Sequence, residues 1–210
     1  MTASGTEIFA RNVPGSTEIL RGSTVALAGC GGLGSNAAVA LVRAGVGSLI
    51  LVDHDVVEAS NLNRQHFFQG DIGRGKVDAL AGHLRAINHE VRLELWKLTL
   101  TPDDVPRLFA RADLLIEAFD RADSKRWLIE AWCRAFPERK VICASGVSGL
   151  GKTEPIGVRR AGNIILCGDE ASDPSQGLCA ARVGIVANME ANLAIEVLVT
   201  EKSHGDDQQP

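Results

Sequence analysis

The chain has 210 residues, of which 45% are hydrophobic and 23% are charged, as is typical of a globular protein with a sizeable core. Its 26 Asp and Glu residues outnumber its 22 Lys and Arg residues, and the formal net charge is −4. Proteins that hold a nucleic-acid backbone non-specifically carry a basic excess, so the composition disfavours a nucleic-acid partner.

Neither a membrane span nor a secretion signal is expected. The sequence shows no apolar run near the roughly 18 residues that cross a bilayer. The N-terminus, MTASGTEIFA, has neither the basic region nor the apolar region of a signal peptide. We therefore expect a cytoplasmic protein that does not contact a membrane.

The predicted elements alternate between buried strands and amphipathic helices. We expect a lead-in segment over residues 1–22, a single domain over 23–200 and a disordered tail over 201–210. Strands are expected over residues 25–28, 48–52, 91–95, 113–118 and 140–144, and helices over 35–44, 76–88, 101–110 and 123–136. This alternation predicts a Rossmann-like α/β fold with a doubly wound, mostly parallel sheet.

The pattern changes after Gly151. Residues 156–160 and 163–167 predict an antiparallel hairpin instead of a further crossover. The polar loop 168–179 is long enough to be functional. Residues 181–200 predict a long final helix that is apolar over most of its circumference. Such a helix is buried, either in the core or at a subunit interface.

A glycine-rich loop follows the first predicted strand and opens the first helix of the domain. The loop residues of interest are Gly29, Gly31, Gly32, Leu33 and Gly34, which supply a GxGxxG pattern. Glycine lets the backbone approach phosphates, and a helix N-terminus offers free N–H groups. Asp53 ends the second strand, where an acidic residue accepts hydrogen bonds from a ribose. This combination predicts an adenine nucleotide, with NAD as its first interpretation.

The next segment favours chemistry at a phosphate over hydride transfer. Asn61, Arg64 and Gln65 follow Asp53 closely, and Lys76 opens the next predicted helix. Attack on a phosphorus atom needs its surrounding negative charge neutralised and both reactants aligned. Asp120 follows a buried strand at the same sheet edge and can hold Mg²⁺ together with substrate phosphates. Its alternative role is to cap the helix that follows.

Together these residues resemble the ATP-dependent activating enzymes of ubiquitin-like proteins. Within them the match is to the bacterial ThiF/MoeB/HesA group, which adenylylates small sulfur-carrier proteins. The matching stretches are AGCGGLGSNAAVALVRAGVGSLILVDHDVVEASNLNRQHFF, IGRGKVDAL and IEAFD, with a looser match through ASGVSGLG and GLCAARVGIVANMEANLAIEVL. The compact length and the closing stretch look most like the short ThiF branch, which is linked to thiamine biosynthesis.

The resemblance implies a role for each residue of the site. It implies that Gly29–Gly34 cradles ATP, that Asp53 binds its ribose, that Asn61, Arg64 and Lys76 contact its phosphates beside Gln65, and that Asp120 holds Mg²⁺. It also implies a homodimer in which Arg11 enters the partner's ATP site; an ordinary surface arginine is the alternative. The implied reaction is attack by the C-terminal glycine carboxylate of a carrier such as ThiS on the α-phosphorus, with release of pyrophosphate.

Two departures and several alternatives accompany this interpretation. The five cysteines form no CxxC pair, so we expect free thiols and no zinc. Cys167 and Cys179 lie near the loop in which some relatives carry a reactive cysteine, but neither has an evident Lys, Arg or His neighbour that would activate its thiol. Sulfur insertion is then expected to need another protein. The alternatives are an NAD-dependent oxidoreductase, a non-catalytic partner subunit, and the same chemistry on a molybdopterin-type carrier or another carboxylate.

Overall fold

Seven strands form one sheet in the computed structural model, which describes residues 5–206. The strands are β1 (Thr24–Ala28), β2 (Ser48–Val52), β3 (Arg92–Trp96), β4 (Leu114–Glu117), β5 (Val141–Ala144), β6 (Gly157–Ala161) and β7 (Ile164–Gly168). Their order is β3-β2-β1-β4-β5-β7-β6, and only the β6–β7 pair is antiparallel. The predicted α/β class, mostly parallel sheet and late hairpin are confirmed.

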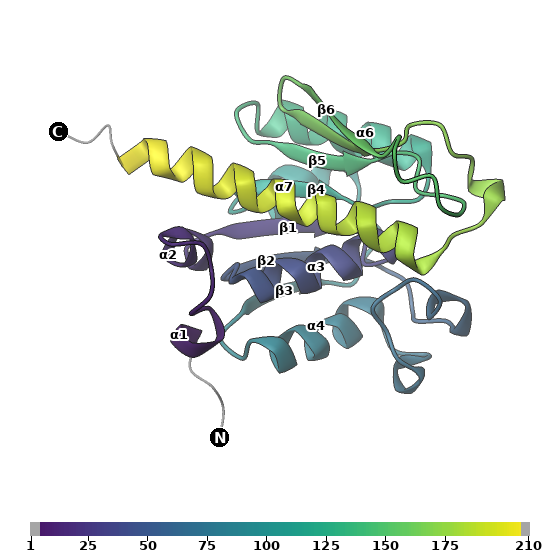
Figure 1. Cartoon of the computed structure of the whole chain (residues 1–210), viewed down its shortest axis with the longest axis horizontal. Coiled ribbons are helices and arrows are strands. Elements are labelled where there is room, and N and C mark those ends of the chain that lie inside the picture. The colour runs from purple at the N-terminus through teal and green to yellow at the C-terminus, as the bar shows by residue number, and fades with distance from the viewer. Residues whose placement is uncertain (1–4, 207–210) are drawn as a thin grey trace.

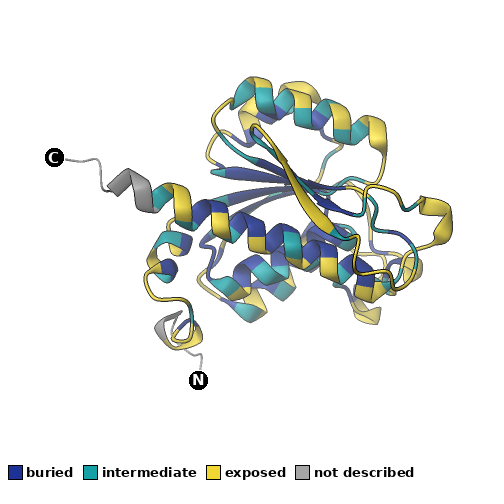
Figure 2. Cartoon of the chain, turned by 45° about the horizontal axis from the view of Figure 1, so that its top comes forward, coloured by how far each residue is buried: buried dark blue, intermediate teal, exposed yellow. Residues whose placement is uncertain are grey.

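Helices cover both faces of this sheet (Figure 1). They are α1 (Gly5–Ile8), α2 (Ser16–Arg21), α3 (Gly32–Ala44), α4 (Lys76–Ile87), α5 (Val105–Leu108), α6 (Ala122–Ala135) and α7 (Ala180–Asp206). One face packs under α3, α4 and α7 and the other under α5 and α6, with α7 lying across α3. Figure 2 shows the central strands buried between these two layers.

The continuous apolar runs of the central strands follow from this two-sided burial. In β1, Val25 and Leu27 face the α3 side, whereas Ala26 and Ala28 face the α6 side, and all four are fully buried. Strand β1 pairs with β2 on one side and β4 on the other. The chain therefore changes direction at β1, and the crevice beyond the C-terminal ends of β1 and β4 is the usual ligand position in such sheets.

Both ends of the chain are more structured than the predicted lead-in segment and tail suggest. Residues 1–22 include α1 and α2, and Phe9 packs on Gly45 while the Asn12 side chain donates to the Ala44 carbonyl at 2.9 Å. Helix α7 continues to Asp206, so the boundary predicted for the tail falls inside this helix. Residues 207–210 of the predicted tail lie outside the described residues.

The expectation that no apolar segment is long enough to cross a membrane needs correction. By length and composition alone, the segment Ala180–Lys202 of α7 could cross a membrane. Half of its most apolar 18-residue stretch, however, is buried inside the fold. The buried side packs on α3 and the sheet, as the core helix of a globular protein does. This segment therefore does not by itself indicate a membrane span.

Helix α7 also carries an unusual buried acid. Glu190 is fully buried, and neither of its carboxylate oxygens has a hydrogen-bond partner within the described part of the chain. Burial raises the pKa of Glu190 well above its usual range, although the positive charge of Lys125 acts in the opposite direction and the charge of Glu117 adds to the rise. Burial likewise raises the pKa of Glu117, against the effect of its ion pair with Lys125.

Replacing Glu190 tests this burial. The unfolded side chain ionises near its ordinary pKa of 4.5, whereas the folded one keeps its proton to a higher pH. Between the two pKa values the folded protein holds a proton that the unfolded chain has released. The free energy of unfolding therefore falls as pH rises through this range. Relative to wild type, the folding equilibrium constant of Glu190→Gln should gain about tenfold per pH unit over that range in urea unfolding.

Glu196→Gln is the matched control for this measurement. Glu196 lies on the exposed side of the same helix, where it pairs with Arg160. Its variant should follow the pH profile of the wild type. Superimposable profiles of Glu190→Gln and wild type would contradict the assignment of a proton to the buried carboxyl.

Candidate functional site

A cavity of about 400 Å³ opens at the crevice beyond the C-terminal ends of β1, β2 and β4. The predicted site residues that line it are Gly29, Gly31, Gly32, Leu33, Asp53, Asn61, Arg64, Gln65, Lys76 and Asp120. Gly34 and Arg11 are the predicted residues that do not line it. The structure thus brings together segments that are up to about ninety residues apart in the chain, as expected where parallel strands end on one sheet edge.

The glycines of the loop have distinct steric roles. Gly29 has a φ of +98°, and a Cβ there would come within 2.7 Å of the Ala118 carbonyl oxygen. A Cβ on Gly34 would lie 1.9 Å from the Gly29 carbonyl oxygen, so Gly34 allows helix and loop to touch. A Cβ on Gly31 would meet only the Gln65 side-chain nitrogen, at 3.8 Å. Gly31 is therefore the position that keeps the cavity open.

Asp53 fastens the glycine loop to the end of β2. Its Oδ2 accepts the backbone N–H of Cys30 at 2.7 Å, and its Oδ1 accepts that of Asp55 at 2.8 Å. Each carboxylate oxygen has a second lone pair, so these bonds leave room for a ribose hydroxyl. Asp53 can therefore shape the loop and contact a nucleotide at once.

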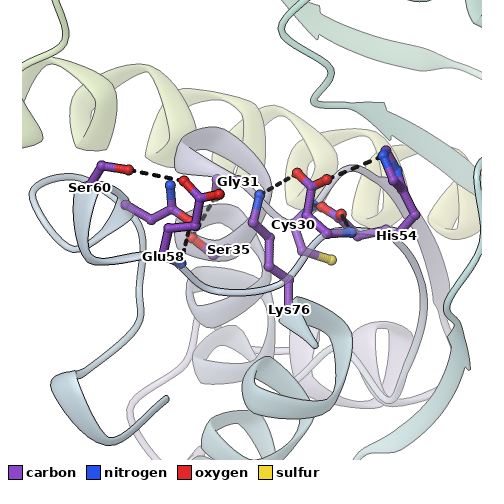
Figure 3. A network of polar contacts seen from close by, with 10 residues as sticks. Cys30, Gly31, Ser35, His54, Glu58, Ser60 and Lys76 are labelled. Carbon is purple, nitrogen blue, oxygen red and sulfur yellow. Dashed lines mark hydrogen bonds and ion pairs between the residues drawn. The ribbon is translucent and has the colours of Figure 1, made fainter. Parts of the chain in front are cut away.

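Lys76 is held inside the cavity by an acid that the sequence analysis did not single out. Its ammonium donates to Asp55 Oδ2 at 2.7 Å, and Lys76 itself is only 7% exposed. His54, labelled beside Lys76 in Figure 3, contacts the other Asp55 oxygen at 3.2 Å. Burial alone raises the pKa of Asp55, but Lys76 and His54 outweigh it and hold that pKa below its usual range. Asp55 is therefore ionised at neutral pH and can accept from Lys76.

The segment that carries Arg64 is tied to the first turn of α3. The Ser35 hydroxyl accepts the His66 N–H at 2.9 Å, and the Asn36 amide donates to the Arg64 carbonyl at 2.9 Å. The guanidinium of Arg64 donates to the Ser60 carbonyl at 3.0 Å and to the Asn63 side chain at 2.8 Å. These contacts place the cation at the end of the cavity beside the glycine loop.

Two amides at this end remain able to bind a ligand. Asn61 is buried and its oxygen accepts the Glu58 N–H at 3.0 Å. Gln65 is 8% exposed, and its Oε1 has no partner within the described residues. A buried polar atom without a partner is costly, so a bound ligand that supplied one would be stabilised here.

Asp120 fits the role of a metal ligand better than the other acids of the cavity. It is exposed on the loop after β4, and within residues 5–206 no hydrogen bond or ion pair engages its carboxylate. Asp53, His54 and Asp55 also lie close enough to share an ion. Their carboxylates, however, already bind backbone N–H groups and Lys76. Mg²⁺ takes one or two protein carboxylates together with substrate phosphate oxygens. The free carboxylate of Asp120 can be such a ligand.

An apolar wall that the sequence analysis missed lines another part of the cavity. Phe119 and Trp127 line it with ring centroids 6.0 Å apart, and Leu98 and Leu100 follow from the end of β3. Trp127 comes from α6, a full turn past the loop. Aromatic and aliphatic side chains of this kind suit a flat heterocycle such as a nucleotide base.

Cys167, Cys179 and Arg11 do not line the cavity. Burial raises the pKa of Cys167 to about 12, so its thiolate is scarcely populated near neutral pH. Cys179 immediately precedes α7 and is half-buried. Arg11 is exposed beside the α1 and α2 helices, which precede β1 and so lie at the sheet edge opposite the cavity. Arg11 therefore does not reach the cavity of its own chain.

A model described as the ThiF family matches residues 8–209. The chain belongs to the ThiF family. The family expected from the sequence is confirmed, whereas its short ThiF branch stays a prediction. The solved E. coli tRNA N6-threonylcarbamoyladenosine dehydratase, TcdA, is similar in fold, with a TM-score of 0.86 at 20% identity over 95% of this chain and 97% of that chain. E. coli MccB with ATP has a TM-score of 0.69 at 22% identity, over 88% and 58%.

Two curated relatives are similar in sequence. The tRNA threonylcarbamoyladenosine dehydratase of Bacillus subtilis strain 168 is 36% identical over 140 residues, which are 66% of this chain and 54% of that protein. The adenylyltransferase and sulfurtransferase uba4 of Emericella nidulans is 31% identical over 197 residues, which are 86% of this chain and 40% of that protein. The chain thus spans about half, or less, of the length of these relatives.

The different steric roles of the loop glycines can be separated by substitution. Gly34→Ala places a methyl group against backbone, so we expect a clearly lower unfolding midpoint, with a loss of about 1–3 kcal/mol or more. Gly31→Ala should cost less stability and yet weaken ATP binding roughly tenfold or more, because the methyl group enters the cavity where phosphates approach. Thermal unfolding and titration calorimetry measure the two effects.

Gly82→Ala is the control for both variants. A Cβ on Gly82 meets nothing within 4 Å, and the residue lies inside α4. Alanine in a helix interior should stabilise the protein by about 0.5–1 kcal/mol and leave ATP binding unchanged. An unaltered ATP affinity in Gly31→Ala would contradict the placement of the phosphates over this loop.

Proposed function

We propose that the protein uses ATP to adenylylate a carboxylate on an acceptor, releasing pyrophosphate. The observation that carries this proposal is that Arg64, Lys76 and Asp120 converge on one cavity with the glycine loop. Membership of the ThiF family and the similarity to an adenylyltransferase and sulfurtransferase support it. An NAD-dependent oxidoreductase, the other interpretation of the glycine loop and Asp53, has little use for two cations and a free carboxylate here, because hydride transfer does not take place at a phosphate.

The chain's own residues would act by binding and alignment. The amides of the glycine loop, at the N-terminus of α3, face the phosphates, and Asp53 binds the ribose. Arg64 and Lys76 neutralise the charge that develops as the acceptor oxygen attacks the α-phosphorus and pyrophosphate leaves. Asp120 would hold Mg²⁺, which supplies further neutralisation of phosphate charge when it is bound. No protein nucleophile is required by this scheme.

We propose as the acceptor the C-terminal glycine of a small ubiquitin-like sulfur carrier such as ThiS, in a cytoplasmic homodimeric enzyme. Two features favour a protein acceptor over a nucleic acid. The net charge is −4, and the loop 168–179 beside the cavity carries Asp169, Glu170 and Asp173 and no basic residue. Phosphate backbones are attracted by basic surfaces, so this rim suits a polypeptide better.

A tRNA-bound carboxylate is the second candidate acceptor. It is favoured by the similarity to tRNA threonylcarbamoyladenosine dehydratases, one of which matches this fold along nearly its whole chain. The two candidates predict different stimulation of pyrophosphate exchange into ATP. A carrier ending in Gly-Gly should stimulate exchange by this protein, whereas a carrier truncated by those two residues and bulk tRNA should not.

The cation and metal assignments are tested by the same exchange assay. Arg64→Ala and Asp120→Ala should each lower Mg²⁺-dependent exchange by about 10²–10³-fold, because each removes charge stabilisation at the phosphates. Both side chains lie at the rim, so thermal unfolding should stay near that of wild type. Arg126→Ala is the control, since that exposed arginine on the outer face of α6 forms an ion pair with Glu130 and does not line the cavity. Native exchange by Asp120→Ala would contradict its assignment to the metal.

The proposed role of Arg11 is tested by mixing inactive variants. Its distance from the cavity of its own chain means that it can act only across a dimer. Arg11→Ala and Arg64→Ala should each be impaired alone. In a mixed dimer one site regains both arginines, so random mixing should restore about a quarter of the wild-type exchange. Failure to regain activity, with mixed dimers demonstrated by mass spectrometry, would refute a shared site.

A further inference from the structure

Two loops build the wall of the cavity beside the phosphate end. Val147 comes from the loop after β5, Leu178 from the loop after β7, and Val183 from the first turn of α7. A Cβ on Gly32 would lie 3.0 Å from Val183 Cγ1. This wall therefore adjoins the helix N-terminus to which the proposed function assigns the phosphates, so an acceptor that reaches the α-phosphorus there would pass close to it.

One buried arginine ties both loops to α7. Arg182 is 4% exposed, and its Nη1 donates to the carbonyls of Gly151 at 2.6 Å and Lys152 at 2.9 Å. Its Nη2 forms an ion pair with Asp169. The planar guanidinium can hold partners in several directions at once, which a lysine cannot. Arg182 thereby contacts the loop after β5 and the loop after β7 simultaneously.

Asp169 extends this contact into the second loop. Its Oδ1 accepts the backbone N–H groups of Ala171 at 2.9 Å and Ser172 at 2.8 Å. Ser172 in turn accepts the N–H of Ser148 through its hydroxyl, at 3.0 Å. Arg182 is thus connected through Asp169 and Ser172 to a hydrogen bond that joins the two loops.

The loops adopt backbone conformations that need such support. Lys152 has a φ of +48° and Glu170 a φ of +55°, both in the left-handed region that residues other than glycine seldom occupy. Each of these residues is directly beside a contact of the Arg182–Asp169 pair: Lys152 offers its carbonyl, and Glu170 follows Asp169. Strained residues persist where the surrounding contacts over-determine them.

We propose that Arg182 and Asp169 form a clamp that positions the acceptor-binding wall, and that Arg182 is a positioning residue for the acceptor and not for ATP. The ribose and base ends of the cavity are built from Asp53, Leu98 and Phe119, which neither residue of the clamp contacts. The wall that the clamp holds is apolar and glycine-flanked, so it fits the extended, uncharged backbone that precedes the reacting carboxylate. This inference rests on the proposed function.

The test compares Arg182→Ala with Arg159→Ala, and measures the ATP affinity and the carrier KM separately for each variant. ATP affinity is measured by calorimetry, and the KM for a carrier ending in Gly-Gly by pyrophosphate exchange. Arg182→Ala should raise the carrier KM at least tenfold and change the ATP Kd by less than twofold. Arg159 is the matched control, because it forms an exposed ion pair with Glu170 of the same loop; its variant should change neither value.

Two conservative variants keep the test valid if Arg182→Ala folds poorly. Asp169→Asn retains an oxygen for the two N–H groups and loses the charge, and Arg182→Lys retains the charge and loses the fork. Both should raise the carrier KM, by less than Arg182→Ala does, and both should speed amide hydrogen exchange in residues 145–153 and 168–178.

The outcomes distinguish the clamp from the proposed function. A carrier KM equal to that of wild type in all three variants would overturn the clamp, as would an equal loss of ATP and carrier affinity. If no carrier ending in Gly-Gly stimulated pyrophosphate exchange by the wild-type protein, the proposed acceptor would instead be overturned, and the clamp's role toward that acceptor with it. Faster amide exchange in the variants would then still show that the pair orders the loops.

Discussion

The close contact between strand β1 and helix α3 is the constraint on which the rest of the site depends. Only glycine at position 34 lets the helix lie against the Gly29 carbonyl. This contact places the free amides of the helix N-terminus at the end of the strand. Ser35 and Asn36, in the same helical turn, then bind the segment that carries Arg64. One backbone contact thus positions both the amides that we propose bind the phosphates and the cation beside them.

The positive charges of the cavity are restrained before any nucleotide binds. Lys76 is paired with Asp55, and Arg64 is held by the Ser60 carbonyl and the Asn63 side chain. Fixed charges need little reorganisation when phosphate charge develops, which is how such sites stabilise a transition state. Asp55 has a further consequence, because ATP must compete with it for Lys76. The ion pair therefore lowers the net attraction of Lys76 for other anions.

Much of the fold was predictable because parallel strands buried on both faces give continuous apolar runs, as at residues 25–28 and 48–52. The convergence of Asp53, Arg64, Lys76 and Asp120 was predictable too, since strand ends share one edge. The side-chain partners that depend on contacts between distant parts of the chain could not be predicted. Asp55, Ser35 and Trp127 occupy ordinary positions in the sequence, and the extension of α7 through Glu201 and Lys202 looks like a polar tail. Nothing local indicates that Arg182 binds two distant loops.

The most direct test of the account is a crystal structure of the protein with a non-hydrolysable ATP analogue and Mg²⁺. The account predicts the triphosphate over Gly31 and Gly32, with Arg64 and Lys76 within hydrogen-bonding distance of its oxygens and Asp120 on the metal. The base should lie toward Phe119 and Trp127. A triphosphate bound elsewhere, with Lys76 still paired to Asp55 and Asp120 facing bulk solvent, would contradict the central claim.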